Sequence, residues 1–373
     1  MKKKVVFFIY ELGAGGAART FVNIVNYINK ETFEPIIVTL NYSGSYEKYV
    51  HEDVRIEKLP AKRLRSAIVP FRDFIKKEQP DIVFSTIPNY NTIAIIARLL
   101  SRTKAKTIVR EAAFLGGSVS ENMKLFFFGQ LYRFAHKVIA LSNGVKENIV
   151  SKYFVPENKI SVIYNPIDLV NIQKLAEEDR FPDEHEVIFQ QKRKTIVTAG
   201  RLVPEKDQKT LIKAFAEVKK RQPVNLIILG EGALIKELQE KARKLQVEED
   251  VHFLGFQENP YKYFKRADVF ALSSEAEGFG HVLVEALATE TLIVSTNCKP
   301  GAEEVLQNGR YGLITPVGDA ETMADQLEKA LTMSTEEKMR RQQEGLYRAK
   351  EFSAETIVRQ YERVFLETIG ADE

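Results

Sequence analysis

The strongest constraint on the fold is a repeated alternation of short apolar runs with longer amphipathic segments. Strands that alternate with helices predict parallel sheets covered by helices on both faces. Further helices are predicted near 320–332 and 335–350. The predicted strands lie at about 4–10, 35–40, 54–58, 81–85, 106–110, 137–141 and 160–164 in the first half, and at 195–199, 224–229, 251–254, 268–272, 291–295 and 311–314 in the second.

Chain length and a local change in composition predict two domains. A chain of 373 residues is too long for one ordinary core and suits two domains of about 150–200 residues each. The alternation pauses over residues 171–194, which are polar and charged and predict a linker. We therefore predict α/β domains over 1–168 and 169–352. Residues 353–373 carry apolar side chains at helical spacing and predict a final helix that packs back on the first domain.

Charge and cysteine content exclude several classes of protein. The 54 basic and 51 acidic residues give a net charge of +3, so no nucleic-acid partner is indicated. The single cysteine, Cys298, excludes a disulfide framework and a cysteine-rich zinc site. The apolar run from Val5 to Tyr10 is interpreted as a buried strand rather than a signal peptide. No apolar stretch is long enough to span a membrane, and we expect a cytoplasmic protein.

The two halves open alike, each with an apolar strand and a glycine-containing turn. In open α/β sheets, ligands bind at the carboxyl ends of the strands. We therefore expect two doubly wound, Rossmann-like domains that face a central cleft, with the functional site in that cleft.

The glycine loop of the first half suggests contact with a phosphate or a sugar. Gly13, Gly15 and Gly16 follow a strand and open a helix, where backbone N–H groups favour negative charge. A dinucleotide site fits poorly, because Ala18 replaces its third glycine and the second strand ends in Thr39-Leu40-Asn41. A purely structural turn remains the alternative.

Two loops of the second half carry candidate ligand contacts. Arg201, after Gly200, and Lys206 follow a strand and precede a predicted helix. Two cations there suit a diphosphate, although a solvated loop is the alternative. Glu231, between Gly230 and Gly232, also follows a strand and indicates either close approach to a ligand or an ordinary turn.

The most informative segment runs from Glu277 to Glu285. Glu277 lies in a turn after a predicted strand, and Gly278, Phe279 and Gly280 lead into a predicted helix that contains Glu285. Carboxylates accept hydrogen bonds from the hydroxyls of sugars and riboses, and a helix N-terminus favours phosphate. The competing interpretation of Glu285 is an acid on a solvated helix face.

Taken together, these motifs resemble the retaining glycosyltransferases of the GT-B fold, in particular the GT4 family (glycosyl transferases group 1). The family signature is Glu-x7-Glu with Gly-Phe-Gly after the first acid, here Glu277 to Glu285. The resemblance extends to the Gly200-Arg201…Lys206 turn, to Gly230-Glu231-Gly232, to Leu254-Gly255-Phe256 and to the Gly15-Gly16 loop.

The resemblance implies a role for each motif. Domain 1–168 would bind the acceptor and domain 169–352 a nucleotide-sugar donor. Arg201 and Lys206 would neutralise the leaving diphosphate and replace a metal ion, Glu277 would bind the donor sugar, and Glu285 would hold the ribose. Gly278, Phe279 and Gly280 would present backbone groups to the donor, and Phe256 would lie beside the nucleobase.

The first domain departs from the family pattern. Many relatives carry a glutamate soon after the double glycine, where this chain has Ala17-Ala18-Arg19. Many also carry a histidine near the reacting sugar, and the corresponding strand ends here contain none. Asn89 and Glu111 are the candidates that remain for the acceptor side.

Two segments mix basic and apolar residues in a way typical of helices that rest on anionic lipid. They are 62–77 and 123–136. Packing of ordinary domain helices is the alternative. The hypothesis that follows is a glycan or lipid-linked acceptor and a peripheral enzyme on the inner face of the membrane.

The resemblance implies transfer of a hexose or N-acetylhexosamine, from a donor we expect to be UDP-linked, in synthesis of a cell-surface polysaccharide or glycoconjugate. Two other functions stay open. A sugar-nucleotide 2-epimerase of the same fold would need its own acids and a histidine in the cleft. A non-catalytic sensor would not need Arg201, Lys206 and both glutamates intact.

Overall fold

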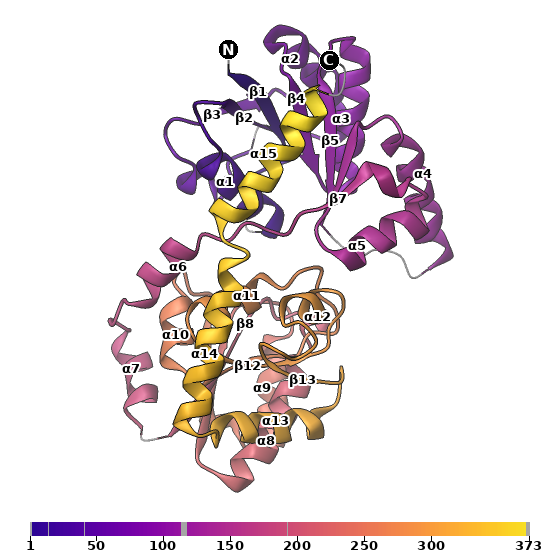
Figure 1. The fold of residues 1–373 in the computed structure, drawn as a ribbon. Coiled ribbons are helices and arrows are strands. Elements are labelled where there is room, and N and C mark those ends of the chain that lie inside the picture. Colours follow the sequence, from indigo (N-terminus) through magenta and orange to yellow (C-terminus); the bar gives the residue numbers. More distant parts are fainter. Residues whose placement is uncertain (1, 14, 41, 113–117, 192, 371–373) are drawn as a thin grey trace. The chain divides into compact units, whose positions relative to one another are not determined.

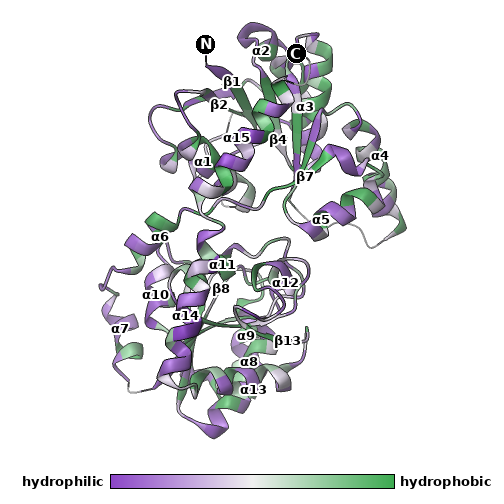
Figure 2. Ribbon diagram, in the orientation of Figure 1, coloured by the Kyte–Doolittle hydropathy of each residue, from purple (hydrophilic) through white to green (hydrophobic). Residues whose placement is uncertain are grey.

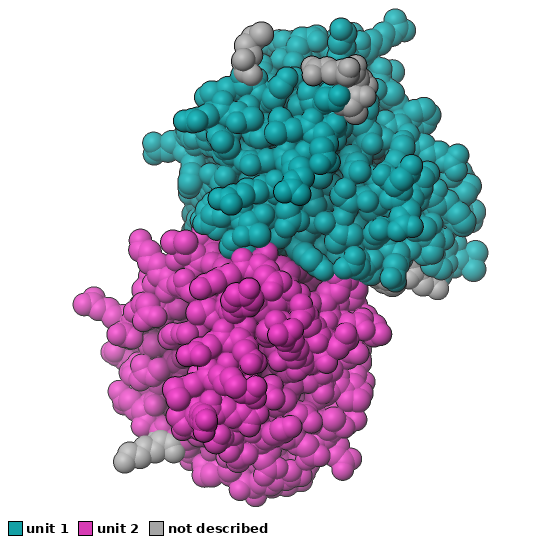
Figure 3. Space-filling view, viewed as in Figure 1, with its two compact units in different colours: residues 1–167, 353–373 teal, residues 168–352 magenta. Residues whose placement is uncertain are grey.

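The computed structural model describes residues 2–13, 15–40, 42–112, 118–191 and 193–370. The chain divides into two compact units (Figure 3). Unit 1 comprises Met1–Ile167 and Ser353–Glu373, and unit 2 comprises Asp168–Phe352. The helix at the end of the chain thus belongs with the N-terminal sheet.

The described part of unit 1 is built on a parallel sheet of seven strands in the order β3-β2-β1-β4-β5-β6-β7 (Figure 1). β1, β4 and β5 lie in the middle and are almost wholly buried, as expected for strands covered on both faces. Figure 2 shows hydrophobic colouring along β1. The strands are β1 (Lys3–Phe8), β2 (Phe33–Leu40), β3 (Arg55–Leu59), β4 (Ile82–Thr86), β5 (Lys106–Glu111), β6 (Lys137–Ala140) and β7 (Ile160–Val162).

Helices cover both faces of this sheet. Alternate side chains of β1, such as Phe7 and Phe8, point to opposite faces. Phe7 packs with α1 (Gly16–Tyr27) and the C-terminal helix α15 (Ala354–Gly370). Phe8 packs with α2 (Ile68–Glu78) and α3 (Pro88–Ser101). Further elements of unit 1 are α4 (Val119–Tyr132), α5 (Asn143–Asn148) and the helical turns η1 (Glu47–Tyr49), η2 (Leu64–Ala67), η3 (Ile149–Tyr153) and η4 (Glu157–Lys159).

The described part of unit 2 holds a parallel six-stranded sheet in the order β10-β9-β8-β11-β12-β13. One face packs against α8, α9 and α13 around Phe215, Leu238 and Met323. The strands are β8 (Lys194–Ala199), β9 (Val224–Leu229), β10 (Val251–Gly255), β11 (Val269–Leu272), β12 (Leu292–Thr296) and β13 (Leu313–Thr315). The helices are α6 (Leu169–Ala176), α7 (Asp183–Gln190), α8 (Gln208–Arg221), α9 (Ile235–Lys244), α10 (Tyr261–Arg266), α11 (His281–Ala288), α12 (Gly301–Val305), α13 (Ala320–Leu331) and α14 (Thr335–Lys350), with short turns at η5 (Pro204–Lys206) and η6 (Glu248–Asp250).

The predicted strands are confirmed, but the linker predicted over 171–194 is wrong. That segment contains most of α6 and all of α7. Asp168 caps α6 by accepting a hydrogen bond from the Asn171 N–H at 3.0 Å, and Leu169 and Ile172 are buried. His185 anchors α7, because its Nδ1 lies 2.8 Å from the Tyr263 hydroxyl. Burial of a few side chains therefore outweighs the polar composition that suggested a linker.

Candidate active site

The candidate site lies at the carboxyl edge of the sheet in unit 2. β8 pairs with β9 on one side and with β11 on the other, so the loops after β8 and β11 leave the sheet at the point where the strand order reverses. Ligands of doubly wound sheets bind at such switch points. The loop after β8 carries Arg201 and Lys206, and the loop after β11 carries Glu277. The topology therefore brings the predicted cations and the first predicted acid to one place.

Lys206 and Glu277 are joined directly. The Lys206 ammonium forms an ion pair with Glu277 Oε1, and the two side chains are only 20% and 14% exposed. The same carboxylate oxygen accepts a hydrogen bond from Ser274 Oγ at 2.9 Å. The Lys206 side chain runs past Gly200, where an added Cβ would lie 3.7 Å from Lys206 Cε. The pair leaves the second carboxylate oxygen and two ammonium protons for a ligand.

Neighbouring loops hold the Glu277 turn in place. Thr296 Oγ1, at the end of β12, donates a hydrogen bond to the Ser274 carbonyl at 2.6 Å. The Gly301 N–H donates to the Glu277 carbonyl at 2.8 Å. A Cβ on Gly301 would lie 2.7 Å from the carbonyl of Phe279, so the close approach requires glycine there. The supporting roles of Ser274, Thr296 and Gly301 were not identified from the sequence.

Cys298 is excluded as a nucleophile by its surroundings. The thiol is buried. Burial, followed by the negative charge of Glu277, raises the pKa of Cys298 to about 11. The thiol is therefore protonated at neutral pH, and only the thiolate is reactive.

The glycine turn and α11 adopt the predicted strand–turn–helix arrangement. Gly280 has a left-handed backbone conformation (φ 79°) and forms the N-cap of α11, so glycine is favoured at that position. The Phe279 ring is buried against His281 and Phe352, at centroid distances of 5.5 and 5.3 Å. Its side chain thus anchors the turn, which leaves only backbone groups of Gly278, Phe279 and Gly280 for a ligand.

Glu285 is buried rather than solvated. It lies on α11 and is 5% exposed, which rules out an acid on a solvated helix face. Burying a carboxylate costs free energy unless polar groups compensate it. We therefore expect Glu285 to have a structural or a ligand-binding role.

Arg201 and Glu231 lie in neighbouring loops with exposed side chains. The Leu202 N–H donates to the Glu231 carbonyl at 2.8 Å, which ties the loop after β8 to the loop after β9. A Cβ on Gly230 would come within 2.0 Å of the Gly200 carbonyl oxygen. Contact between these two loops therefore explains the glycine at 230. This agrees with the interpretation of this segment as an ordinary turn.

Phe256 follows β10 and is 66% exposed. The carbonyl of Gly255, the residue before Phe256, accepts a hydrogen bond of 2.7 Å from the Gly230 N–H. This bond attaches the loop after β10 to the loop after β9. An exposed aromatic ring at the carboxyl edge can stack on a flat ligand.

The predicted glycine loop of unit 1 precedes α1. Gly15 is the N-cap of α1 with an extended backbone (φ −170°), and a Cβ there would meet nothing within 4 Å. Gly15 and Gly16 are exposed. No steric need within the described residues explains Gly15, which is consistent with space for a ligand beside it.

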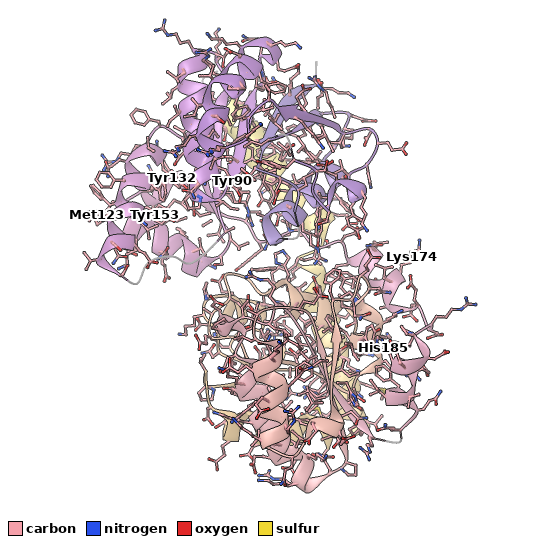
Figure 4. The ribbon with its side chains drawn as sticks, turned by 180° about the vertical axis from the view of Figure 1, so that it is seen from behind. Tyr90, Met123, Tyr132, Tyr153, Lys174 and His185 are labelled. Carbon is pink, nitrogen blue, oxygen red and sulfur yellow. The ribbon has the colours of Figure 1, made fainter. Side chains whose placement is uncertain are left out.

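Glu111 cannot contact an acceptor as suggested from the sequence. Its carboxylate is fully buried and accepts hydrogen bonds from Asn91 Nδ2 at 3.0 Å, from Tyr153 at 3.2 Å and from Tyr132. Tyr132 and Tyr153 are labelled in Figure 4. Burial raises the pKa of Glu111 to about 7, although these hydrogen bonds lower it. Glu111 is a structural residue, whereas Asn89 is exposed in the first turn of α3.

Solved structures with the same fold define the class of protein. The chain resembles Anabaena HepE in complex with UDP and glucose, with a TM-score of 0.83, 20% identity, and coverage of 98% of this chain and 100% of that chain. It also resembles a glycosyltransferase from Rickettsia africae, with a TM-score of 0.82, 19% identity and coverage of 99% of both chains. The fold is that of the GT-B glycosyltransferases.

Sequence comparison gives the family. The model of the family described as "Glycosyl transferases group 1" matches residues 179–347, and that of "Glycosyltransferase Family 4" matches residues 14–171. An N-acetylgalactosamine-N,N'-diacetylbacillosaminyl-diphospho-undecaprenol 4-alpha-N-acetylgalactosaminyltransferase from Campylobacter jejuni is 31% identical over 377 residues, which cover 96% of this chain and 98% of that protein. This chain belongs to the glycosyl transferases group 1 family and is a glycosyltransferase.

Proposed function

We propose that this enzyme transfers a hexose or N-acetylhexosamine, with retention of configuration and without a metal ion, from a UDP-sugar to a lipid-linked glycan. The observation that carries the proposal is the Lys206–Glu277 pair at the switch point of unit 2. A cation and a carboxylate held side by side suit a donor in which a diphosphate is bonded to a sugar.

Each site residue has one task in this proposal. Lys206 and Arg201 bind the diphosphate and stabilise the charge that develops as it leaves. Glu277 accepts hydrogen bonds from the donor sugar, and Glu285 holds the ribose. The N-terminal end of α11, where the helix dipole favours negative charge, faces a phosphate.

The base and the backbone contacts complete the donor site. In this proposal Phe256 contacts the nucleobase, Glu231 contacts the donor from the neighbouring loop, and Gly278 to Gly280 present backbone groups to the sugar and phosphate. The leaving phosphate oxygen takes the proton of the attacking acceptor hydroxyl on the same face of the sugar. The enzyme therefore needs no nucleophile of its own, and its task is charge stabilisation and placement.

The choice of donor and acceptor is supported by relatives. The Campylobacter jejuni enzyme is named as an N-acetylgalactosaminyltransferase acting on a diphospho-undecaprenol-linked saccharide. A second enzyme of that organism, 26% identical over 346 residues, has a name of the same kind. HepE is described in complex with UDP-glucose. These names favour UDP-N-acetylgalactosamine and a lipid-linked acceptor as the first substrates to try.

A lipid-linked acceptor implies work at a membrane surface, and α4 offers a surface for it. In the described residues no helix is long and apolar enough to cross a bilayer. Val119 and Phe127 of α4 are 83% and 62% exposed, and Met123 (labelled in Figure 4), Phe126 and Phe154 are exposed beside them. This aromatic surface of α4 suits the interfacial region of a membrane.

The other predicted lipid-binding segment, 62–77, is an unsuitable candidate. Phe71, Phe74 and Ile75 of α2 are buried in the core of unit 1, which is the domain packing that the sequence left open. Flotation with anionic vesicles tests the α4 surface: Phe127→Ser should reduce binding, and Tyr347→Ser, at an exposed site on α14, should not. Equal flotation of both variants and wild type would remove α4 from the proposal.

Thermal-shift screening against nucleotide sugars, followed by product analysis on the best ligand, tests the proposed function. We expect stabilisation by a UDP-sugar and transfer in the presence of EDTA. Binding of a UDP-sugar without turnover would favour a sensor. Conversion of the free nucleotide sugar into its 2-epimer would favour an epimerase.

A further inference from the structure

Tyrosine rings from separate strand ends stack together at the carboxyl edge of the sheet in unit 1. Tyr10 follows β1, Tyr42 follows β2, and Tyr90 (labelled in Figure 4) lies in the first turn of α3, after β4. The rings of Tyr10 and Tyr42 are 5.2 Å apart with an interplanar angle of 23°. Those of Tyr10 and Tyr90 are 6.2 Å apart with an angle of 20°. We call this group the tyrosine stack.

The tyrosine stack marks the switch point of unit 1. β1 pairs with β2 on one side and with β4 on the other. The helices that follow β1 and β4, α1 and α3, pack on opposite faces of the sheet. Tyr10 and Tyr90 therefore flank the position at which doubly wound sheets bind ligands.

A carboxylate lies beside the stack. Glu11 is exposed, and its negative charge acts on the hydroxyls of both Tyr10 and Tyr90. A Cβ on Gly13 would lie 3.0 Å from Glu11 Oε1. Because residue 13 has no side chain, the Glu11 carboxylate can occupy this place. The open space beside Gly15 adjoins the same loop.

One ring of the stack, that of Tyr42, is exposed and is held by a hydrogen bond. Tyr42 is 36% exposed, and its hydroxyl donates a hydrogen bond of 2.8 Å to the Lys62 carbonyl. Hydrogen bonding with Tyr42, followed by burial and the charge of Glu11, raises the pKa of Tyr10 to about 12. The Tyr10 hydroxyl is thus protonated at neutral pH, and its ring carries no charge.

We infer that the tyrosine stack and Glu11 bind the terminal sugar ring of the acceptor. Aromatic faces carry partial negative charge and attract the C–H groups on the apolar face of a pyranose ring. The Glu11 carboxylate accepts hydrogen bonds from sugar hydroxyls and disfavours an anionic ligand such as a phosphate. This inference deepens the proposed function and rests on it for the role of the sugar as acceptor.

Binding of octyl α-N-acetylgalactosaminide to the full chain tests the inference without requiring turnover. Saturation-transfer NMR gives the contact face, and titration gives the affinity. Tyr42→Ala should weaken binding about fivefold to tenfold, because the exposed ring is lost, whereas Tyr42→Phe keeps the ring and loses only the hydrogen bond to the Lys62 carbonyl, so it should lose less than Tyr42→Ala. Glu11→Gln should weaken binding several-fold by removing the charged acceptor. Tyr49→Ala is the matched control, an exposed tyrosine of the same unit outside the stack.

Each outcome bears on the inference separately from the proposed function. Wild-type affinity in Tyr42→Ala and Glu11→Gln, or no binding by the wild type at millimolar concentration, would overturn it. UDP-N-acetylgalactosamine is tested in parallel by thermal shift and turnover. If the glycoside binds through Tyr42 and Glu11 but UDP-N-acetylgalactosamine is neither bound nor turned over, the sugar site stands and the proposed donor fails.

Discussion

Replacement of Lys206 by alanine is the sharpest test of the donor site. The Lys206 ammonium contacts Glu277 in the structure and carries three N–H donors, so it can hold the carboxylate and a phosphate together. Lys206→Ala removes both contacts. Glu277 keeps its side-chain hydrogen bond from Ser274, at 2.9 Å.

The expected magnitude follows from these two losses. Removing one donor aimed at developing negative charge lowers kcat by about 10²–10³-fold, or ~2.7–4 kcal/mol of barrier. Loss of the charge-assisted hydrogen bond that positions Glu277 adds a contribution of about 1.5–3 kcal/mol at most. We therefore expect a fall in kcat of at least about 10²-fold. Because both residues act together, the Lys206→Ala/Glu277→Ala double variant should lose less than the product of the single effects.

The assay is steady-state transfer from UDP-N-acetylgalactosamine, with thermal unfolding as a check on the fold. Lys209→Ala is the matched control: Lys209 lies on α8 and pairs with Glu237 at 2.7 Å, with side chains 42% and 55% exposed. Exposed pairs contribute little, so this variant should behave like wild type. Equal activity of Lys206→Ala and Lys209→Ala would refute the assignment.

Three further predictions concern Glu285, Gly280 and Glu111. Glu285→Gln should raise the KM for the donor about tenfold with little change in kcat, because one charge-assisted hydrogen bond to the ribose is lost; titration with UDP checks this. Gly280→Ala should destabilise unit 2 by about 1–2 kcal/mol, because φ is 79° and the new Cβ would lie 3.2 Å from Leu283 Cδ1; thermal unfolding measures it. Glu111 has a pKa raised from 4.5 to about 7 by burial, so the folded state binds the proton more tightly than the unfolded chain. The stability that protonated Glu111 contributes is therefore fully present below about pH 4.5, and the free energy of unfolding falls by roughly 3 kcal/mol as the pH rises through about 7. Urea unfolding of wild type and of Glu111→Gln across this range should show this fall only in the wild type. If the free energies of unfolding of the two proteins change with pH in parallel, the prediction is contradicted.

Much of the fold was predictable because strand positions in parallel sheets follow from local patterns. Runs such as Leu226–Leu229 are apolar, short and bounded by turns, and each forms a strand. The prediction of a linker over 171–194 was wrong because the helices of that segment, α6 and α7, depend on a few buried contacts such as that of His185 with Tyr263. Such long-range contacts leave no local periodicity in a charged sequence.

The candidate site was predictable in its motifs and not in its supporting contacts. Glu277 and Lys206 are 71 residues apart, yet each lies just after a strand, and the strand ends of a parallel sheet share one edge. Thr296, the last residue of β12, and Gly301, the first residue of α12, support the Glu277 turn, and only the folded arrangement reveals them.

Burial of single charged residues was the hardest feature to predict. Glu111 and Glu285 both follow or interrupt apolar runs, and the structure buries both. Glu111 lies in a hydrogen-bond network with tyrosines from α4 and η3. Glu285 lies on α11, which follows the Glu277 turn. The partners that decide between these roles come from distant parts of the chain.

In the proposed donor site, Arg201, Lys206, Glu277 and Glu285 hold a UDP-sugar for metal-independent transfer with retention. The most direct measurement is the anomeric configuration of the product formed from UDP-N-acetylgalactosamine and a lipid-linked N-acetylgalactosaminide in the presence of EDTA. We predict an α-linked product, read from the one-bond C–H coupling of the new anomeric centre by NMR. A β-linked product, or a reaction that stops when EDTA is added, would contradict the account.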